Sequence, residues 1–282
     1  MIIQKKARAK INLYLKILDK RPDGYHNIFT VMQKISLCDD ITININPDDK
    51  KNINIICENI NIPTDKTNTA YKAAELFLER AKISADVEIT INKKIPAQSG
   101  LGGGSSDAAA VLLGLNEYFD FILPENVLIE TAMKIGADVP FFVKNANCAV
   151  CEGIGEIVTP MYIDLSNFCC VIVKPIYNIS TKQAYDNWDI SPADAQCAPL
   201  RDFGDIIKYT HNDFYNLAVS QNNNIKHIKK ILLKSGAVAA ELTGSGSALF
   251  GIFDSIDAAL KLKDIINHTP DIEFCDIFEF LC

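Results

Sequence analysis

Long apolar runs are missing from this sequence. No stretch of the 282 residues approaches the roughly 20 apolar residues that a membrane-spanning helix needs. The first residues, Met1-Ile2-Ile3-Gln4-Lys5-Lys6, lead into a short apolar stretch that charges interrupt, so we expect no signal peptide. Repeats and low-complexity tracts are also lacking. With 48% hydrophobic residues, the chain can bury a sizeable core, and we expect a soluble globular protein of one large or two ordinary domains with no membrane partner.

Positive charge is in deficit. The chain has 28 Lys and Arg residues against 35 Asp and Glu, which gives a formal charge of −7 and a pI near 5.2. Nucleic acids and anionic membranes favour a basic protein face. We therefore expect neither as the principal partner, and any anion that the protein binds must be held locally.

The nine cysteines form an odd set without a regular framework. Reduced thiols in a cytoplasmic protein explain them better than disulfides do. Cys148 and Cys151 form the only CxxC pair, with no helix-start signal, no second pair and no nearby His to complete a metal site. The sequence therefore predicts neither a redox centre nor a zinc site, and no protein-held metal.

The glycine-rich segment from Pro96 to Ser106 is the most informative part of the chain. It has four glycines in the five residues from 100 to 104, which favours close approach of a ligand to bare backbone. An alanine-rich run follows, and Ser105, Ser106 and Asp107 are residue types that cap a helix start. Loop and helix would direct free N–H groups and the positive helix end at one spot, which predicts a phosphate site. A flexible linker is the alternative, but linkers do not usually end in a capped helix.

The common nucleotide fingerprints do not fit this segment. A Walker A loop needs Gly-Lys-Ser/Thr, whereas Gly104 is followed by Ser105. The dinucleotide pattern fails because the third residue after Gly102 is Ser105 and the third after Gly104 is Asp107. The patterns G-x-S-x-G and H-E-x-x-H are missing as well, so neither a hydrolase triad nor a zinc protease is supported.

Periodicity predicts a β-rich start followed by mixed helices and strands. Residues 7–17 alternate as a half-buried strand, and the turn Pro22-Asp23-Gly24 leads to a returning strand. The expected elements of this half are strands at 28–37, 41–45, 53–57 and 87–91 and helices at 68–80, beyond 105 and at 125–135. Gly136 is expected to cap the last helix, which places Asp138 in a short interhelical or helix-starting segment.

The pattern begins again after Thr159-Pro160, so we place a domain boundary between residues 158 and 159. The expected elements beyond it are strands at 168–173, 237–242 and 248–253, helices at 225–234 and 256–266, and a last strand. Residues 186–205 have the composition of a loop. This order predicts an α+β protein with antiparallel strands in its second half.

Three segments read together resemble the GHMP small-molecule kinases. Lys10 and Asn12 lie on the polar face of the first strand, and the glycine loop and Gly136-Ala137-Asp138-Val139-Pro140 follow in family order. The resembling motifs also include Arg21-Pro22-Asp23-Gly24-Tyr25-His26 and Leu242-Thr243-Gly244-Ser245-Gly246, so the resemblance spans nearly the whole chain. It implies the two-domain α+β GHMP kinase fold, with an ATP-binding domain over 1–158 like the second domain of ribosomal protein S5 and a ferredoxin-like, substrate-binding domain over 159–282.

The motifs around Lys10 and Tyr25 resemble the branch of that family whose acceptor is a cytidine diphosphate-linked methylerythritol. The implied reaction transfers phosphate from ATP to the 2-hydroxyl of this small molecule in the non-mevalonate isoprenoid pathway. Asn68 matches a position on the adenine side, although an ordinary N-cap explains it as well. Mg²⁺ is implied by ATP chemistry, with Ser106 or water as its ligand and no carboxylate identified. The residues that the resemblance assigns to ATP are Pro96, Ala97, Gln98, Ser99, Gly100, Leu101, Gly102, Gly103, Gly104, Ser105, Ser106 and Asn68.

The resemblance assigns catalysis to Lys10 and Asp138. Asp138 would accept the proton of the attacking hydroxyl, and the Lys10 ammonium would keep that carboxylate ionised and stabilise the transferring group. Without the motif context, Asp138 would be a helix cap and Lys10 a solvated strand lysine. These two assignments stand or fall together.

The substrate residues implied by the resemblance are Asn12, Tyr25, His26, Tyr185, Thr243 and Gly244. Two tyrosines, Tyr25 and Tyr185, would sandwich the cytosine, and His26 would read its edge. Without the resemblance, His26 would be an ordinary turn histidine, Tyr185 a tyrosine on a surface helix, and residues 243–247 a simple hairpin turn. Two alternative functions remain. The protein could be another GHMP kinase that acts on mevalonate, homoserine or a sugar, or a non-catalytic nucleotide-binding protein of the same fold. The sequence does not determine the oligomeric state.

Overall fold

The structure is a computed structural model that describes residues 2–47, 52–144, 146–188, 197, 200 and 202–281. The chain divides into two compact units made of discontinuous segments. Unit 1 comprises Met1–Ala9, Leu37–Ala97 and Gly102–Ala146, and unit 2 comprises Lys10–Ser36, Gln98–Leu101 and Asn147–Cys282. Within the described part, every helix is too short or too polar to cross a membrane. The expected boundary between residues 158 and 159 stays a prediction.

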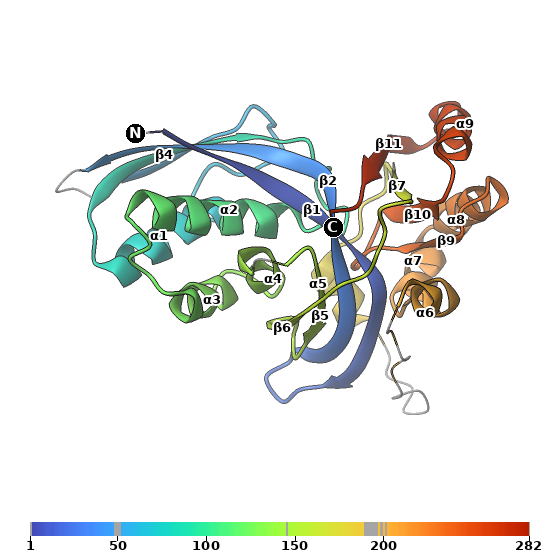
Figure 1. Ribbon diagram of the computed structural model, residues 1–282, viewed down its shortest axis with the longest axis horizontal. Helices are drawn as coiled ribbons and strands as arrows, with labels where there is room; N and C mark the ends of the chain where they lie inside the picture. Colours follow the sequence, from blue (N-terminus) through green and yellow to red (C-terminus); the bar gives the residue numbers. More distant parts are fainter. Residues whose placement is uncertain are drawn as a thin grey trace. The chain divides into compact units, whose positions relative to one another are not determined.

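The elements are traced in Figure 1. Their order is β1 (Ile2–Lys20), β2 (His26–Pro47), β3 (Asn52–Ile56), α1 (Thr69–Ala81), β4 (Ala85–Asn92), α2 (Gly103–Tyr118), α3 (Glu125–Met133), α4 (Val139–Val143), β5 (Cys148–Glu152), β6 (Ile157–Met161), β7 (Cys169–Pro175), α5 (Thr181–Asp186), α6 (Phe203–Tyr209), β8 (His211–Asn212), α7 (Tyr215–Gln221), α8 (Asn224–Lys234), β9 (Ala239–Leu242), β10 (Leu249–Phe253), α9 (Ile256–Asn267) and β11 (Ile272–Glu279).

The long strands β1 and β2 are neighbours in the first sheet. Its strand order is β3-β4-β2-β1-β8, and in addition β5 pairs with β2 and β6 pairs with β5. The predicted strand at 7–17 is confirmed within the longer β1. The separate strands expected at 28–37 and 41–45 are wrong as two elements, because β2 continues through both. It changes partner along its length, pairing with β5 over Thr30–Gln33 and with β4 over Asp40–Pro47.

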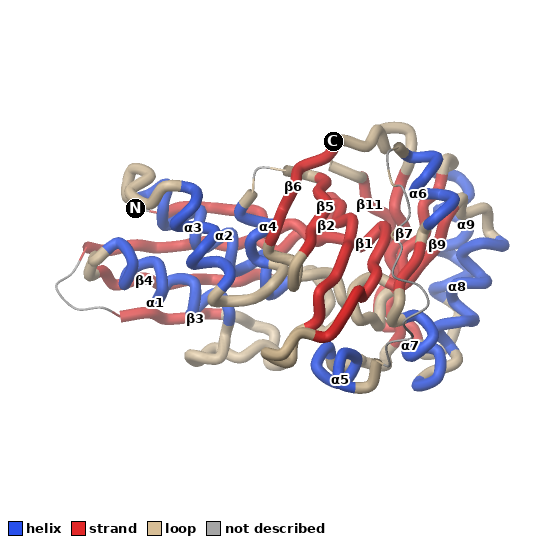
Figure 2. Tube along the Cα trace, turned by 90° about the horizontal axis from the view of Figure 1, so that it is seen from below, coloured by secondary structure: helices blue, strands red, loops and turns tan. Residues whose placement is uncertain are grey.

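In unit 1, the helices α1 and α2 pack against each other below the strands, and α3 packs against α1, α2 and α4 (Figures 1 and 2). The helix α1 buries Ala70, Ala73 and Phe77, at the spacing that the sequence predicts. The helix α2 buries Ala108, Ala109 and Ala110, whose small side chains allow close packing on α1. This packing fixes the helix whose first turn follows the glycine loop.

Two predicted helix ends differ in the structure. The helix α2 begins at Gly103, and the N-cap is Gly102, whose backbone is left-handed (φ 74°) and provides no side-chain cap. The expected caps Ser105, Ser106 and Asp107 are therefore wrong, since all three lie inside the helix. Likewise α3 ends at Met133 with Lys134 as its C-cap, and Gly136 lies beyond it without the left-handed backbone of a glycine cap.

In unit 2, a second antiparallel sheet runs β11-β7-β10-β9 and carries α8 and α9. Val171 and Val173 of β7 belong to one buried apolar cluster with Leu232 of α8 and Leu262 of α9. The predicted strands at 168–173, 237–242 and 248–253 and the helices at 225–234 and 256–266 are confirmed, with shifts of one or two residues. Residues 189–196, 198, 199 and 201 of the expected loop lie outside the described residues, and α5 and α6 occupy its two ends.

The CxxC pair lies on the buried strand β5. Burial raises the pKa of the Cys148 thiol to about 12, and Cys151 is fully buried. The cysteines in the described part of the chain are free thiols. A protonated, buried thiol is a poor nucleophile and a poor metal ligand, so Cys148 serves as an apolar side chain of β5.

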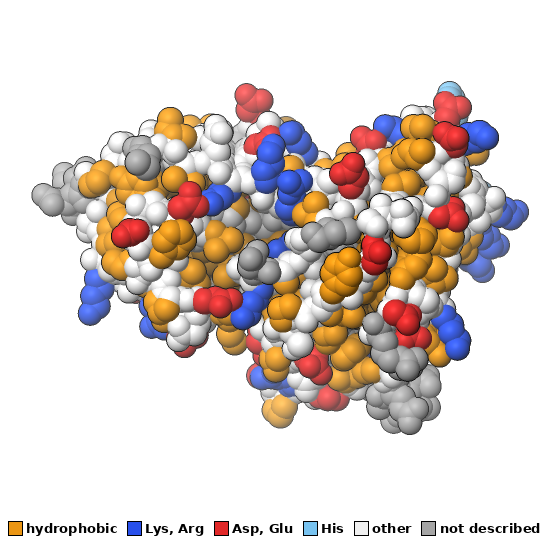
Figure 3. All heavy atoms as spheres, in the orientation of Figure 1, with side chains coloured by type: hydrophobic (Ala, Val, Ile, Leu, Met, Phe, Trp, Pro, Cys, Tyr) orange, Lys and Arg blue, Asp and Glu red, His pale blue; other side chains and the backbone are white. Residues whose placement is uncertain are grey.

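On the face drawn in Figure 3, Asp and Glu side chains lie among Lys and Arg, with apolar side chains between them.

Candidate active site

Lys10 and Asn12 occupy adjacent positions on one face of β1, in unit 2. Their side chains are almost fully buried, with Lys10 2% exposed and Asn12 1% exposed. The Lys10 Nζ donates to Asn12 Oδ1 at 2.7 Å and to the carbonyl of Gly100 at 2.8 Å. The expectation of a solvated strand lysine is therefore wrong, because a buried ammonium needs acceptors and Lys10 has them on the glycine loop.

The two glycine loops of the sequence meet at Gly100 and Thr243-Gly244, all within unit 2. The Asn12 Oδ1 accepts the Gly244 N–H at 2.8 Å, and the Thr243 hydroxyl lies 3.3 Å from the Gly100 carbonyl oxygen. A Cβ added at Gly100 would lie 2.1 Å from the Thr243 carbonyl oxygen, which is closer than atoms can approach. The plain hairpin-turn interpretation of residues 243–247 does not account for this contact, since the turn is built against the first loop.

Two polar residues that the sequence reasoning missed hold this arrangement. Asn212, on β8, donates through Nδ2 to the carbonyls of Leu242 and Gly244, both at 2.8 Å, and so fixes the second loop. Thr30 on β2 accepts from Asn12 Nδ2 at 2.8 Å and donates to the Tyr14 carbonyl at 2.6 Å. Both side chains are buried. An isolated Asn or Thr in a strand is common, so their roles depend on contacts that only the fold creates.

His26 and Tyr185 come together in unit 2, as the motif resemblance implies. Their rings are stacked, with centroids 5.3 Å apart, and the Trp188 ring meets His26 edge-on at 6.1 Å. The Tyr25 ring is 60% exposed and contacts no aromatic ring in the described part of the chain. Trp188 was not predicted, although it is the single tryptophan of the sequence. The cytosine sandwich between Tyr25 and Tyr185 stays a prediction.

Burial lowers the pKa of His26 below its ordinary value, and the Lys20 ammonium acts in the same direction, while Asp186 and Asp19 oppose them. The imidazole is therefore neutral near pH 7. A neutral imidazole has one N–H donor and one ring-nitrogen acceptor. That pair suits the edge of a nucleobase, which presents both kinds of group.

In unit 1, the start of α2 and the segment at Gly136 lie side by side. The helices α2 and α4 are in contact, and a Cβ at Gly136 would lie 3.9 Å from Ser105 Oγ. Asp138 is the residue before α4, and its side chain makes no capping hydrogen bond there. The helix-cap alternative for Asp138 is therefore confirmed in position, since Asp138 is the N-cap residue of α4, although its side chain does not bond to the helix. Lys10 belongs to unit 2 and Asp138 to unit 1, so their pairing stays a prediction.

Asn68 begins α1 as its N-cap. Its Oδ1 accepts the Ala70 N–H at 2.8 Å, and its Nδ2 donates to the Pro63 carbonyl at 2.6 Å. The next residue, Thr69, donates to the Gly104 carbonyl at 2.7 Å. The capping interpretation of Asn68 is therefore confirmed, and its nearness to an adenine ring stays a prediction.

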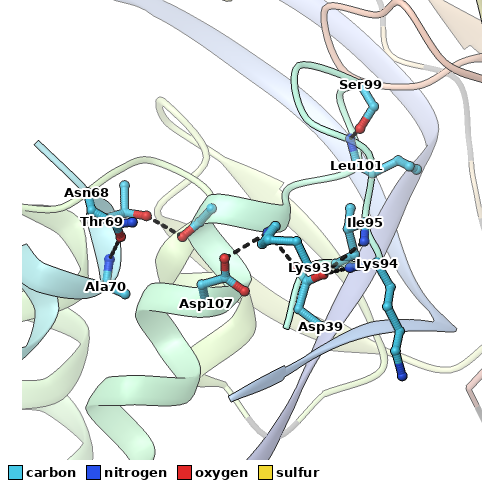
Figure 4. A network of polar contacts seen from close by, with 11 residues as sticks. Asp39, Asn68, Thr69, Ala70, Lys93, Lys94, Ile95, Ser99, Leu101 and Asp107 are labelled. Atoms are coloured by element: carbon cyan, nitrogen blue, oxygen red, sulfur yellow. Dashed lines mark hydrogen bonds and ion pairs between the residues drawn. The ribbon is translucent and has the colours of Figure 1, made fainter. Parts of the chain in front are cut away.

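A buried ion group lies at the base of the glycine loop in unit 1 (Figure 4). The Lys93 Nζ is 2.5 Å from Asp39 Oδ2 and 2.8 Å from Asp107 Oδ2. Burial raises the pKa of Asp107 above its ordinary value, whereas the Lys93 ammonium opposes this shift and favours the ionised carboxylate, and the Asp39 carboxylate adds to the rise. The sequence reasoning read Asp107 only as a cap and did not single out Lys93 or Asp39.

The described residues contain no group of three or more His, Cys, Asp or Glu side chains that could hold a metal ion. Mg²⁺ in nucleotide enzymes is held by substrate phosphates, waters and only one or two protein oxygens. The residues present are compatible with a Mg²⁺ that a triphosphate carries, to which the Ser106 hydroxyl of α2 is the predicted protein ligand.

Comparison with known proteins gives two family matches. Residues 68–145 match the family described as GHMP kinases N terminal domain, and residues 198–270 match GHMP kinases C terminal. A 4-diphosphocytidyl-2-C-methyl-D-erythritol kinase from Caldicellulosiruptor saccharolyticus is 42% identical over 275 residues, which is 93% of this chain and 93% of that protein. The enzyme of the same name from Clostridium tetani is also 42% identical, over 93% of this chain and 96% of that protein.

Solved structures agree with these matches. A crystal structure of 4-(cytidine 5'-diphospho)-2C-methyl-D-erythritol kinase superposes with a TM-score of 0.81 at 27% identity, over 98% of this chain and 99% of that one. A homoserine kinase from Cytophaga hutchinsonii, at 19% identity and a TM-score of 0.70, shares the fold. Buried Lys10 and Asn12, the paired glycine loops and these matches lead to one conclusion: the chain belongs to the GHMP kinases, and among them to the family of 4-diphosphocytidyl-2-C-methyl-D-erythritol kinases.

Proposed function

We propose that this protein uses ATP to phosphorylate the 2-hydroxyl of 4-diphosphocytidyl-2-C-methyl-D-erythritol, which gives ADP and the 2-phosphate in the non-mevalonate isoprenoid pathway. The observation that carries the proposal is the buried contact of Lys10 and Asn12 with both glycine loops. This contact joins the loop predicted for ATP to the loop predicted for the acceptor. A cytoplasmic location, favoured by the free thiols, is part of the same proposal.

The loop from Pro96 to Ser106 holds the triphosphate in this proposal. Gly102 and Gly103 leave backbone N–H groups at the start of α2 without Cβ atoms in front of them, and the helix adds its positive end. Mg²⁺, when bound with ATP, lowers the charge of the phosphates, and the buried Ser106 is the predicted hydroxyl at that end. Lys10 contributes a fixed positive charge at the Gly100 side of the loop.

Asp138 is the proposed general base. A carboxylate that accepts the proton of the acceptor hydroxyl, or orients that hydroxyl in a loose transition state, meets the need of phosphoryl transfer. Asp138 occupies the N-cap position of α4, and its side chain makes no capping hydrogen bond to that helix.

The acceptor is held by the aromatic and second-loop residues of unit 2. Tyr185 offers a flat aromatic face to cytosine, and the neutral imidazole of His26 beside it offers a donor and an acceptor to the edge of the base. The exposed Tyr25 can cover the opposite face of the base. Asn12, Thr243 and Gly244 line the sugar and phosphate end.

The test is ADP release by the purified protein with ATP, Mg²⁺ and one acceptor at a time. We expect release with the cytidyl substrate and a new phosphomonoester in the ³¹P spectrum. Release with mevalonate, homoserine or a sugar, and none with the cytidyl substrate, would favour another GHMP kinase. No release with any acceptor would favour a non-catalytic nucleotide-binding protein.

Asp138→Asn tests the base. We expect it to bind ATP nearly as tightly as the unaltered protein and to lose turnover by about 10²- to 10⁴-fold, the range that general acid–base catalysis supplies. Undiminished turnover in a folded Asp138→Asn protein would refute the role of Asp138.

A further inference from the structure

The ion group Asp39–Lys93–Asp107 joins the residues that flank the glycine loop, and the proposed function assigns it no role. Lys93 follows the last residue of β4, and Asp107 lies in the opening turns of α2, so the two residues mark the two ends of the loop. Their side chains are 6% and 5% exposed, and that of Asp39 is 0% exposed. Figure 4 shows the Lys93 side chain between the two carboxylates, directed at both.

Asp39 also fixes the backbone where the loop begins. Its Oδ1 accepts the N–H of Lys94 at 2.5 Å and the N–H of Ile95 at 2.8 Å. One carboxylate of β2 therefore binds the Lys93 ammonium through one oxygen and the two amides that directly precede the loop through the other. These amides cannot shift without breaking charge-assisted hydrogen bonds, which are about twice as strong as neutral ones.

The first turn of α2 rests directly on Lys93. A Cβ added at Gly103 would lie 3.3 Å from Lys93 Nζ and 3.1 Å from Ile95 Cγ2, which is tighter than most real contacts. On the other side of the turn, the Thr69 hydroxyl donates to the Gly104 carbonyl at 2.7 Å. The amides predicted to bind phosphate are thus held from two sides, by the ion group and by the start of α1.

Stability alone does not account for this ion group. Two carboxylates share one ammonium in a dry site, and burying such groups costs several kcal/mol per ion in typical proteins. Asp107 Oδ1 is buried without a hydrogen-bond partner in the described structure, which adds to that cost. Apolar residues of similar volume often stabilise a fold as well or better. What they cannot supply is a directional link between the two ends of a loop.

We propose that Asp39, Lys93 and Asp107 form an ionic clasp that presets the glycine loop for nucleotide binding. Lys93 and Asp107 are positioning residues, because they act through the backbone of the loop and the first turn of α2. The proposal rests on the proposed function, since it takes the loop as the site of the triphosphate.

The expected effect follows from the fraction of time that the loop holds its binding geometry. When that fraction falls to about one tenth, the apparent dissociation constant of the nucleotide rises about tenfold. The three residues of the ion group belong to unit 1, whereas the predicted acceptor residues belong to unit 2. Loosening the clasp is therefore expected to raise the KM for ATP more than the KM for the acceptor.

The principal variant is Asp107→Asn, which keeps the shape and removes the charge. The matched control is Lys94→Gln, because Lys94 is adjacent in sequence and pairs with Asp40 at 2.8 Å, but its side chain is 50% exposed. Lys93→Gln is the second clasp variant. Exposed pairs such as Lys94–Asp40 contribute little, so the control separates the loss of any lysine pair from the loss of the clasp.

Two measurements test the proposal. Calorimetric ADP binding is expected to weaken about tenfold in Asp107→Asn and to stay unchanged in Lys94→Gln. Amide hydrogen exchange of the nucleotide-free protein is expected to be faster at residues 98–106 in Asp107→Asn, with the exchange of α8 and α9 unchanged. An Asp107→Asn protein with ADP affinity and loop exchange both within twofold of the unaltered protein would overturn the clasp.

The exchange measurement keeps the clasp separate from the proposed function. If the unaltered protein fails to phosphorylate the cytidyl substrate, the proposed function falls, whereas the exchange at residues 98–106 still decides the clasp. Should Lys93→Gln fail to fold, Asp107→Asn carries the test. Unchanged exchange with weakened ADP binding would also overturn the clasp, since the loss would not come from loop geometry.

Discussion

At the scale of single residues, burial decides what a polar side chain does. Lys10 looks like any strand lysine in the sequence, but at 2% exposure its ammonium must find acceptors, and it finds Asn12 and the Gly100 carbonyl. Asn12 in turn accepts from Lys10 and from the Gly244 amide. The pair therefore links two loops that are far apart in the sequence.

Replacement of Lys10 by Met is expected to remove this link together with a fixed charge. We expect kcat/KM to fall by about 10²- to 10³-fold, the effect of losing one preorganised electrostatic contact in a catalytic site. Lys6→Met is the matched control, because Lys6 lies on the same strand with its side chain 60% exposed and paired to Asp40. Steady-state kinetics of both variants test the electrostatic role of Lys10. A Lys10→Met protein with kcat/KM within threefold of that of the unaltered protein contradicts this role.

His26 gives a prediction on pH. Its pKa is lowered in the folded protein, mainly by burial, so the folded state binds fewer protons than the unfolded state near pH 6. The contribution of the neutral ring to stability is therefore present above pH 6.5 and is lost as the pH falls through the folded pKa. An NMR titration should place the midpoint of His26 below 6.5, and a midpoint at or above 6.5 would show that burial does not control this ring.

At the scale of elements, contacts override local signals. Ser105, Ser106 and Asp107 have the composition of a helix cap, but α2 begins earlier because Gly102 adopts a left-handed backbone. Asp107 then turns to the Lys93 ammonium instead of capping the helix. The strand β2 likewise continues where the alternation seemed to break, since β4 provides its second half with a partner.

The close approach of the two glycine loops predicts that Gly100 tolerates no side chain. Gly100→Ala places a Cβ 2.1 Å from the Thr243 carbonyl oxygen on a left-handed backbone, so we expect a folded protein with separated loops and lost turnover, or a failure to fold. Gly24→Ala is the control, because Gly24 is also left-handed (φ +90°) but meets no atom within 4 Å.

Unfolding in urea separates the two effects. Gly24→Ala should cost about 1–2 kcal/mol, which is the penalty of a left-handed alanine alone. Gly100→Ala should cost more, and equal losses in the two variants would show that the loops separate without strain.

At the scale of the whole molecule, the family assignment makes substrate choice testable by stability. A ligand that binds only the folded protein stabilises it by about 2.7 kcal/mol when present at a hundredfold excess over its Kd. Cytidine diphosphate should therefore raise the thermal midpoint, and mevalonate should not. Measured by scanning fluorimetry with each ligand, a shift with mevalonate and none with cytidine diphosphate would contradict the assignment of the acceptor.

The sequence by itself determined the α+β class, most of the longer helices and strands, and the motifs that resemble the family. Periodicity suffices there, because alternating strands and amphipathic helices are local properties of the chain. The resemblance to the GHMP kinases, which rests on the order of motifs along the chain, assigned roles to the glycine loop, Lys10, Asp138 and His26, and these roles stay predictions. Element ends were less predictable, as α2 and α3 show.

Only the tertiary structure decided which polar groups meet. The contacts that matter join different segments of the sequence. They are those of Gly100 with Thr243, Asn212 with the second loop, His26 with Trp188, and Lys93 with Asp39 and Asp107. No local pattern encodes them, since burial gives a polar group its need for a partner and the fold alone supplies that partner. The glycine loop is thus recognisable in the sequence, whereas what holds it in shape becomes visible only in the folded chain.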